Sequence, residues 1–497
     1  MLTQRFLAVA ITAAALAGID RPGATQGPQA PEKAGWISLF DGRTLDGWKA
    51  SEHPEAWTVK DGTLSCNGER AHLFYVGPVA QAQFTDFEAE FEVFAHTGAN
   101  SGVYFHTAWV DKGWPTQQGF EMQVNNHQPV FPGDTGAAYV ENKKTGSLYG
   151  VRNAFKALAR DNEWFTLKLH VQGPRVRIRV GDTLVVDYLE PEGVVAGLTP
   201  PLQKIGTGTF ALQCHDGKSQ VQYRRIAVHP LPPATRTTRA PNPDPASAQR
   251  YRLSRDNFPL VDLRALDSKD AALLEPALAA ARGGGLFVGV TASAGKNRAI
   301  KDDAGVDGLV RRFGGKSLFL GLRADERGWA TTITPKALAR IDFVLLDGEM
   351  LAAGLPKTTS ADPQAYGDAA LAATVSALTQ EPIDVYGAPL FVPATLAGQR
   401  DAIWTEARQQ QIIDAAVANR VAIEINGALQ LPDEAFVRKA RAAGAKFTLG
   451  HCAVDTPAAD YCFGLRERVG LSWRDMYQPG HVPPRGANAT PTVGVVP

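Results

Sequence analysis

The sequence has few of the features that mark nucleic-acid or zinc proteins. Lys and Arg together number 51, and so do Asp and Glu, so the formal net charge is zero. Because phosphate recognition needs a basic surface, this balance predicts no nucleic-acid partner. Cysteine occurs 4 times among 497 residues, and no pair has the CxxC spacing that structural zinc sites use.

Long apolar runs are also scarce. Residues 6–18 are almost wholly apolar, but this run is shorter than the ~20 residues that a spanning helix needs. The run follows Arg5 and contains Ala15-Leu16-Ala17, a small-x-small cleavage signal. We therefore predict a signal peptide at residues 1–24 and a periplasmic or secreted protein whose mature form has no membrane span. An uncleaved anchor is the alternative.

The cysteines divide evenly between the two halves of the chain, as Cys66 and Cys214, then Cys452 and Cys462. Export would place them in an oxidising compartment and would favour one disulfide in each half. The alternative is that they are small buried hydrophobic residues.

The first half of the chain has the pattern of a β-sandwich. Between residues 36 and 230, apolar and polar residues alternate with a period of two, as in Phe87-Glu88-Ala89-Glu90-Phe91. This period is typical of half-buried strands. Many short strands separated by turn signals predict an antiparallel sandwich of the jelly-roll kind.

A proline-rich linker, residues 231–255, separates this region from a second domain at residues 256–476. There, strand-like runs alternate with Ala-rich helical segments, which predicts a parallel α/β barrel of the TIM-like kind with seven strands. The expected strands are 260–263, 286–290, 318–322, 341–346, 383–387, 421–425 and 446–449. The Gly- and Pro-rich tail at 477–497 is expected to be disordered.

A set of short motifs runs along most of the first domain. They are Leu39-Phe40-Asp41-Gly42, Leu45-Asp46-Gly47-Trp48, Trp57-Thr58-Val59, Asp61-Gly62-Thr63-Leu64, Asp86-Phe87-Glu88, Ala99-Asn100-Ser101-Gly102-Val103, Gly119-Phe120-Glu121-Met122-Gln123-Val124, Thr135-Gly136-Ala137 and Leu212-Gln213-Cys214-His215. In order and spacing, this domain resembles the 3-keto-disaccharide hydrolase domain family. The resemblance implies a concanavalin-like double sheet that cleaves glycosides already oxidised at C3.

The second domain resembles the polymerase-and-histidinol-phosphatase metal hydrolases, which are seven-stranded barrels. The best match is Ala422-Ile423-Glu424-Ile425-Asn426-Gly427, followed by a helix and Gly450. That family opens with a His-x-His metal pair, whereas residues 261–267 contain no histidine, and its closing Asp-x-His element is not matched at 451–455. We therefore predict a degenerate barrel without a tightly bound pair of metals.

The resemblance of the first domain implies a particular chemistry. A ketone at C3 acidifies the hydrogen on C2, a base removes that proton, the enolate expels the C1 substituent, and water adds to the product. Such a site needs a base near C2, a stabiliser near O3 and an acid near the glycosidic oxygen. The cofactor is left open, with a divalent cation as one stabiliser considered.

The strand alternation selects polar side chains that point away from the sandwich core. Glu121, His215 and His106 are the expected catalytic residues. The expected substrate-binding residues are Asn100, Gln123, Asn125, Tyr139, Trp109 and Gln213. Glu121 is the most informative because its neighbours are apolar, and we expect its carboxylate to be partly solvated. Relatives often carry arginine at the position of His106 and aspartate at that of Asn125, and an amide is a weak cation ligand.

Other polar residues have two interpretations each. Glu90 either joins the same face or is a solvated strand residue. Lys143 and Lys144 either stabilise an oxyanion or form a solvated pair in a loop. In the barrel, Asp347 and Glu424 are the expected metal ligands, with Glu349 and His451 nearby, because barrels place chemistry at the carboxyl ends of strands. The alternative for the barrel is a site that no longer functions.

The favoured function is an exported hydrolase or lyase of 3-keto-glycosides, whose partner is an oxidised mono- or disaccharide glycoside. Two alternatives stay open. One is a carbohydrate-binding sandwich without catalysis, since fold does not fix function; the departure at Asn125 favours it. The other is a metal-dependent phosphoesterase in the barrel, which the missing histidines disfavour.

Overall fold

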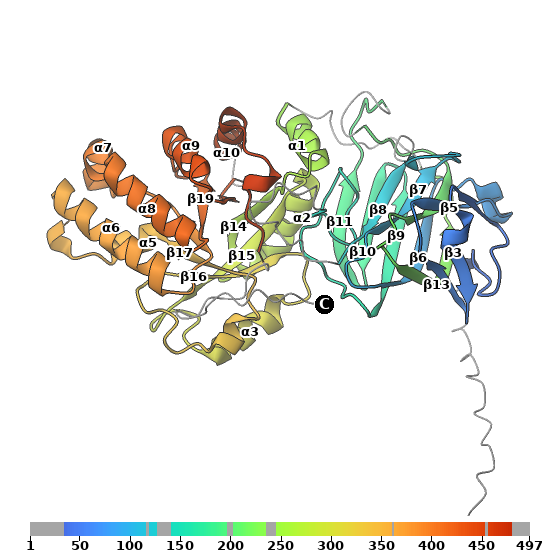
Figure 1. Cartoon of the computed structure of the whole chain (residues 1–497), viewed down its shortest axis with the longest axis horizontal. Coiled ribbons are helices and arrows are strands. Elements are labelled where there is room, and N and C mark those ends of the chain that lie inside the picture. Colours follow the sequence, from blue (N-terminus) through green and yellow to red (C-terminus); the bar gives the residue numbers. More distant parts are fainter. Residues whose placement is uncertain are drawn as a thin grey trace, which may run out of the picture. The chain divides into compact units, whose positions relative to one another are not determined.

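The computed structural model describes residues 34–115, 119–126, 141–195, 202–234, 245–359, 362–452 and 456–479. The signal peptide expected at 1–24, Tyr139 and nearly all of the tail expected at 477–497 lie outside these residues. The described chain forms an antiparallel β-sandwich followed by a closed parallel α/β barrel, which confirms the expected fold class (Figure 1).

The sandwich consists of two antiparallel sheets. The larger sheet has the order β11-β10-β9-β6-β13-β4-β3, and β1 pairs with β13; the smaller sheet has the order β2-β5-β12-β7-β8. The strands are β1 (Ile37–Ser38), β2 (Trp48–Ser51), β3 (Trp57–Lys60), β4 (Thr63–Cys66), β5 (Ala71–Tyr75), β6 (Phe87–Ala95), β7 (Ser101–Thr107), β8 (Phe120–Val124), β9 (Trp164–Gln172), β10 (Arg175–Val180), β11 (Thr183–Leu189), β12 (Thr209–Cys214) and β13 (Val221–Pro230).

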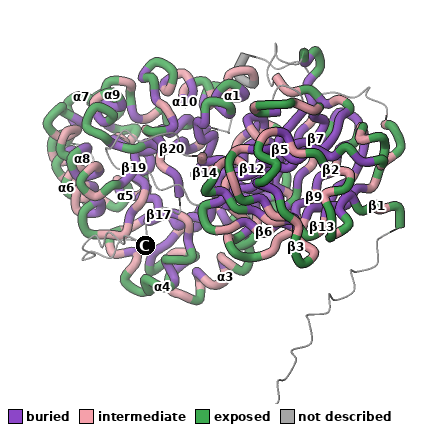
Figure 2. Tube along the Cα trace, turned by 45° about the vertical axis from the view of Figure 1, so that its right-hand side comes forward, coloured by how far each residue is buried: buried purple, intermediate pink, exposed green. Residues whose placement is uncertain are grey.

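Alternation along the strands builds the core of the sandwich. Phe91 and Val93 of the larger sheet are fully buried, as are Val103 and Leu212 of the smaller sheet. Because successive side chains of a strand point to opposite faces, the residues between them in β7 and β12 face away from the core. Strands β5, β7, β8 and β12 of the smaller sheet are buried on both faces, and Figure 2 shows this burial along β7.

The barrel closes in the order β14-β15-β16-β17-β18-β19-β20, and all of these pairs are parallel. Each of the seven expected strands overlaps one of them. The strands are β14 (Val261–Asp267), β15 (Phe287–Ala294), β16 (Phe319–Ala324), β17 (Phe343–Asp347), β18 (Val385–Gly387), β19 (Ala422–Asn426) and β20 (Phe447–Gly450).

Helices lie between and outside the barrel strands (Figure 1). The α-helices are α1 (Pro245–Arg255), α2 (Leu274–Gly284), α3 (Asp303–Phe313), α4 (Pro335–Leu338), α5 (Gly348–Ala353), α6 (Pro363–Gln380), α7 (Arg400–Ile403), α8 (Glu406–Ala418), α9 (Glu434–Ala442) and α10 (Thr456–Val469). Short 3₁₀ helices are η1 (Pro54–Ala56), η2 (Val79–Ala82), η4 (Ala271–Leu273), η5 (Lys357–Thr359), η6 (Ala394–Gln399) and η7 (Trp473–Asp475). Helix α1 lies within the segment expected to be a linker.

Side-chain caps begin many of these helices. Asp302, Asp362, Thr405 and Asp433 each accept a hydrogen bond from a backbone N–H in the first turn of the following helix. Such caps satisfy N–H groups that have no partner inside the helix. Asp347 caps α5 in the same way, which fixes its carboxylate at the end of β17.

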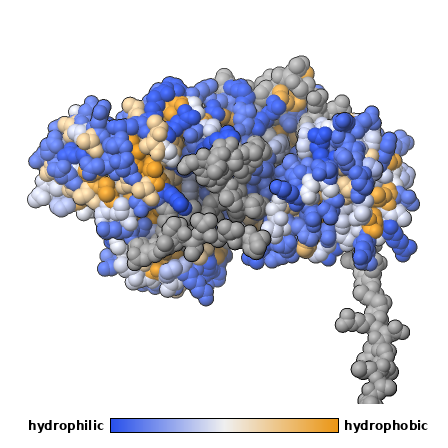
Figure 3. Space-filling view, in the orientation of Figure 1, coloured by the Kyte–Doolittle hydropathy of each residue, from blue (hydrophilic) through white to orange (hydrophobic). Residues whose placement is uncertain are grey.

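The surface is mainly polar on the face that Figure 3 presents, where apolar residues form small separate groups. Within the described residues, no helix has both the length and the apolar character that crossing a bilayer requires.

The two cysteine pairs differ. Cys452 and Cys462 form a disulfide, whereas Cys66 and Cys214 are buried free thiols. One pair therefore follows the expected disulfide, and the other follows the alternative of small buried residues.

Candidate functional site

Two rows of side chains cross the face of the smaller sheet that points away from the core. Strand pairing sets the rows, because residues paired across antiparallel strands project to the same face. The first row contains Ser51, His72, Gln213, Gly102 and Gln123, and the second contains Lys49, Phe74, Ala211, Tyr104 and Glu121. Phe74, Tyr104 and Ala211 form an apolar cluster separate from the main core.

Glu121 lies at the end of the second row, on β8, and both of its carboxylate oxygens are engaged. Oε2 accepts a hydrogen bond from the Tyr104 hydroxyl at 3.0 Å, and Oε1 accepts one from Gln213 Nε2 at 3.1 Å. Gln213 Nε2 also donates to the Tyr104 oxygen at 2.9 Å. Glycine at position 102 makes room for this group, since a Cβ there would lie 2.3 Å from Glu121 Oε1.

The environment of Glu121 changes its proton affinity. Its residue is only 7% exposed, so the carboxylate is more buried than the sequence led us to expect. Burial is the main cause that raises the pKa of Glu121 to about 8, against the opposing effect of the hydrogen bonds from Tyr104 and Gln213. Burial, together with the nearby carboxylate, also raises the pKa of Tyr104 well above its usual range.

Several buried polar atoms beside Glu121 have no hydrogen-bond partner among the described residues. They include Oε1 of Gln123, Oε1 of Gln213 and both ring nitrogens of His72. Gln123 Nε2 donates to Asn100 Oδ1 at 2.8 Å, which orients both amides. Burial lowers the pKa of His72 to about 4, so its ring is neutral near pH 7. Because unpaired buried polar atoms are costly, this pattern is typical of a face that binds a polar ligand.

Aromatic rings lie beside these polar groups. The Trp114 ring is 5.5 Å from the ring of His72 and 5.1 Å from that of His215, and 39% of Trp114 is exposed. His215 Nδ1 lies 2.8 Å from Asp216 Oδ2, which fixes the imidazole at the end of β12. Trp109 packs against Phe74 at 5.0 Å, at the other end of the aromatic group.

The structure places His106 and Glu90 away from Glu121. A shift in strand register opposite His106, where its φ is +53°, turns its side chain out of the row. His106 Nε2 lies 2.9 Å from the carbonyl oxygen of Thr85, and its ring packs on Phe87. Glu90 belongs to β6 in the larger sheet and forms an ion pair with Arg225 at 3.5 Å.

Asn125 binds the backbone of the following loop. Its Nδ2 donates to the carbonyl oxygens of Glu141 and Lys143 at 3.2 and 3.1 Å, and its backbone N–H donates to Thr145 Oγ1 at 2.8 Å. The amide therefore positions this loop, a role for which an amide donor is suited and a carboxylate is not.

The lysine pair that follows is fully buried, which contradicts the interpretation of a solvated pair. Burial lowers the pKa of Lys143, and it lowers the pKa of Lys144 to about 8. The Lys143 ammonium is 3.5 Å from Glu141 Oε1 and 4.3 Å from the Tyr149 ring. The Tyr149 backbone N–H donates to the Glu121 carbonyl oxygen at 2.9 Å, so this group is tied to β8.

A comparison with known protein families finds a match for the sandwich. Residues 35–229 match the 3-keto-alpha-glucoside-1,2-lyase-like domain. The matched region is the whole sandwich and leaves out the barrel, so the resemblance of the barrel to metal hydrolases stays a prediction.

Individual relatives of the lyase-like domain are distant. The chain is 26% identical to a 3-keto-disaccharide hydrolase of Bacteroides thetaiotaomicron over 173 residues, 31% of this chain and 58% of that protein. A solved structure from Parabacteroides distasonis, described as a candidate glycosyl hydrolase, is 20% identical with a TM-score of 0.34, covering 40% of this chain and 94% of that one. The carbohydrate-binding module CBM66 from Bacillus subtilis is 16% identical with a TM-score of 0.25, covering 37% and 95%.

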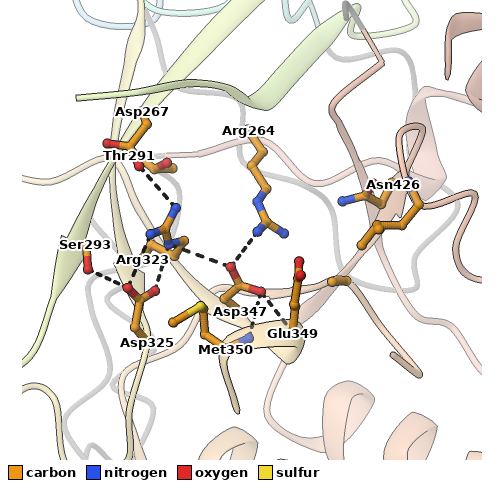
Figure 4. A network of polar contacts seen from close by, with 12 residues as sticks. Arg264, Asp267, Thr291, Ser293, Arg323, Asp325, Asp347, Glu349, Met350 and Asn426 are labelled. Carbon is orange, nitrogen blue, oxygen red and sulfur yellow. Dashed lines mark hydrogen bonds and ion pairs between the residues drawn. The ribbon is translucent and has the colours of Figure 1, made fainter. Parts of the chain in front are cut away.

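Outside the sandwich, a second polar group lies at the carboxyl ends of the barrel strands (Figure 4). Asp347 and Glu424, the expected metal ligands, both face Arg264 of β14. Arg264 Nη2 donates to Asp347 Oδ2 at 2.5 Å, and Arg264 Nη1 lies 3.6 Å from Glu424 Oε2. Burial is the main cause that raises the pKa of Asp347, against the opposing effect of Arg264.

Among the described residues, no group of three or more His, Cys, Asp or Glu side chains is arranged to hold a metal ion. Glu349 is exposed and His451 is half-buried. The His451 backbone N–H donates to Asp262 Oδ1 at 3.0 Å. The guanidinium of Arg264 thus supplies positive charge between the two carboxylates.

Two residues of the site on the smaller sheet, Tyr104 and His72, were not predicted from the sequence. Tyr104 is absent from the residues expected above, although its place opposite Glu121 follows from the pairing of β7 with β8. His72 lies in Ala71–Tyr75, a strand that is buried on both faces and so shows no alternation.

Proposed function

We propose that the sandwich cleaves 3-keto-glycosides by removing the C2 proton, expelling the C1 substituent and adding water to the resulting enone. The observation that carries the proposal is Glu121, a buried carboxylate of raised pKa on a face with unfilled hydrogen-bonding groups. The match of residues 35–229 to a lyase-like domain supports this choice of chemistry.

Glu121 is the proposed general base. A C2 hydrogen beside a ketone is a weak acid, and a carboxylate with a pKa of about 8 is a stronger base than an ordinary one. The carboxylate takes the C2 proton, and the C2–H electron pair forms the enolate with oxygen at C3. In the hydration step, water bonds to C1 and gives a proton to His215, which lost its own proton to the leaving oxygen. Glu121, whose proton has exchanged with solvent, protonates C2.

Neighbouring groups hold this base in place. Tyr104 keeps its proton because its pKa is high, so its hydroxyl continues to donate to Glu121. Lys143, which acts electrostatically on Glu121, would favour the negative charge of the enolate. We assign proton donation to the leaving oxygen to His215, whose Nδ1 is held by Asp216, so that Nε2 is the transferring nitrogen.

Substrate contacts would come from the unpaired atoms of the first row. Gln123 and Gln213 offer buried acceptor oxygens for sugar hydroxyls. Trp114 offers an exposed ring face, and aromatic rings next to polar groups are common in ligand sites.

The described residues do not fit a divalent cation at this site. Cations of this kind prefer several oxygen ligands, whereas both Glu121 oxygens accept hydrogen bonds from Tyr104 and Gln213, and Asn125 binds loop carbonyls. The proposed steps therefore use side chains of this chain alone.

We propose further that the protein is exported, with residues 1–24 as the signal peptide. The short apolar run with its cleavage signal supports this. The Cys452–Cys462 disulfide also supports it, because disulfides are rare in reducing compartments.

The test uses 4-nitrophenyl 3-keto-glucosides of both anomers and the full chain. We expect release of nitrophenol, deuterium at C2 of the sugar when the reaction runs in D₂O, and no release from the parent glucosides, whose C3 carries a hydroxyl. Binding of the keto-glucosides without release, by a folded protein, would instead assign the sandwich to carbohydrate binding alone.

A further inference from the structure

Among the residues that the structure describes, two buried polar atoms on facing side chains at the carboxyl ends of the barrel strands, the mouth of the barrel, have no hydrogen-bond partner. They are Arg264 Nη1 and Glu424 Oε1. The two side chains are 9% and 1% exposed, and the nearest approach between them, from Nη1 to Oε2, is 3.6 Å. Glu424 Oε2 is already used, since it accepts from the Ala388 N–H at 2.6 Å and from Asn426 Nδ2 at 3.0 Å.

The charges around these atoms select the class of ligand. Asp262, Asp325, Asp347 and Glu424 are buried, and the guanidinium groups nearby are those of Arg264, Arg323 and the more exposed Arg298. A carboxylate excess repels an anion such as phosphate. A metal ion would compete with Arg264 for Asp347 and Glu424, which the guanidinium already faces.

A hydroxyl group can serve both unpartnered atoms and carries no net charge. It donates its hydrogen to a carboxylate oxygen and accepts from a guanidinium N–H, so one neutral group would satisfy Glu424 Oε1 and Arg264 Nη1 together. Polar side chains continue beyond this pair. Arg323 bridges Asp325 at 2.7 Å and Asp267 at 3.3 Å, and its side chain is 19% exposed, which leads from the buried pair toward solvent (Figure 4).

We propose that the mouth of the barrel binds a neutral polyhydroxylated ligand of the sugar class, with one hydroxyl between Arg264 and Glu424. This end of a barrel is where ligands of such folds are bound. The inference does not depend on the proposed activity of the sandwich, which uses different residues.

The test is saturation-transfer NMR with methyl α-D-glucopyranoside on the full chain, combined with hydrogen exchange. We expect saturation transfer, together with slower exchange of peptides covering β14, β17 and β19. Glu424→Gln, which keeps the shape of the side chain, should weaken binding about tenfold, the scale of a hydrogen bond to a charged group. Glu121→Gln in the sandwich should leave this protection unchanged.

Several results would overturn the proposal. One is the absence of saturation transfer and of protection in the barrel. Another is protection confined to β7 and β8 that disappears in Glu121→Gln. A third is protection of the barrel strand ends by inorganic phosphate or Mn²⁺ but not by the glucoside. The hydrogen-exchange pattern of the unmodified chain decides the question even if Glu424→Gln does not fold.

Discussion

Replacement of Glu121 by Gln should strongly lower turnover and yet stabilise the sandwich at high pH. The variant keeps the shape of the side chain and removes the base, so we expect turnover of 3-keto-glycosides to fall by ~10²-fold or more. The gain in stability at high pH follows from burial of the Glu121 carboxylate, which raises its pKa. A solvated carboxylate would give no such gain.

The magnitude comes from proton linkage. A carboxyl group with a folded pKa of about 8 and an ordinary value of 4.5 binds its proton more tightly in the folded state. Folding stability is therefore lost as pH rises from the ordinary pKa to the folded one, and the full loss is present above pH 8. At about 1.4 kcal/mol per pKa unit, the loss is about 5 kcal/mol. Glutamine does not ionise and avoids this loss.

The assay compares wild type and Glu121→Gln at pH 5 and pH 9, using hydrogen exchange of peptides from β7 and β8 under increasing urea, which reports on the sandwich. We expect a small difference at pH 5 and a more stable variant at pH 9. Glu90→Gln is the matched control, because Glu90 is buried to a similar extent in the other sheet; turnover should be kept. Equal stability of wild type and Glu121→Gln at both pH values, or wild-type turnover in the folded variant, would refute the reasoning.

Three further predictions follow from the same contacts. The kcat/KM of wild type should rise with pH, with its midpoint near pH 8, since Glu121 must lose its proton to act as base. A flat profile from pH 6 to 9 would exclude Glu121 as the base. Gly102→Ala should displace the Glu121 carboxylate, which lowers turnover and costs about 1–3 kcal/mol in stability. Gly206→Ala is the control, because no atom lies near its Cβ. Kinetic and melting measurements should show neither change in this control. Arg264→Leu should destabilise the barrel by about 3–5 kcal/mol in urea unfolding, because it leaves buried charge unpaired. Adding Asp347→Asn should restore part of that loss. Equal stability of the single and the double variant would contradict the ion pair.

The barrel was predictable from sequence because its strands are short apolar runs separated by helices with clear starts. Asp302, Asp362, Thr405 and Asp433 stand directly before helices, where a cap is needed. The sandwich was predictable from alternation in strands such as β6. Helix α1 was missed because the prolines that precede it and its own polar residues favour a linker by composition.

The candidate site was predictable only in part. Glu121, Gln123 and Gln213 stand at polar positions of alternating strands, so local pattern was sufficient to choose them. Their convergence depends on which strands are neighbours, and alternation alone does not give that order. The same limit explains Glu90, which has the same pattern but belongs to the other sheet.

His106 and Lys143 show a second limit, which concerns burial. A register shift in β7 rotates His106 away from the row that its position in an ideal strand would join. Lys143 lies in a segment without periodicity, where lysine is ordinarily solvated. Its burial depends on the loop backbone, which Asn125 holds through two carbonyl groups.

At the barrel mouth, the sequence shows that histidines are missing, but only the structure shows that Arg264 faces the two carboxylates. The lack of histidine at residues 261–267 predicts that a metal pair of the resembled kind is absent, but the sequence does not show which group faces Asp347 and Glu424. Arg264 stands in that same histidine-free segment, and β14 brings its guanidinium to both carboxylates. A cation carried by the chain cannot exchange with solvent and has a fixed geometry. The buried acids of the mouth thus face a guanidinium fixed to β14, and hydrogen bonding is the means of ligand recognition that we propose there.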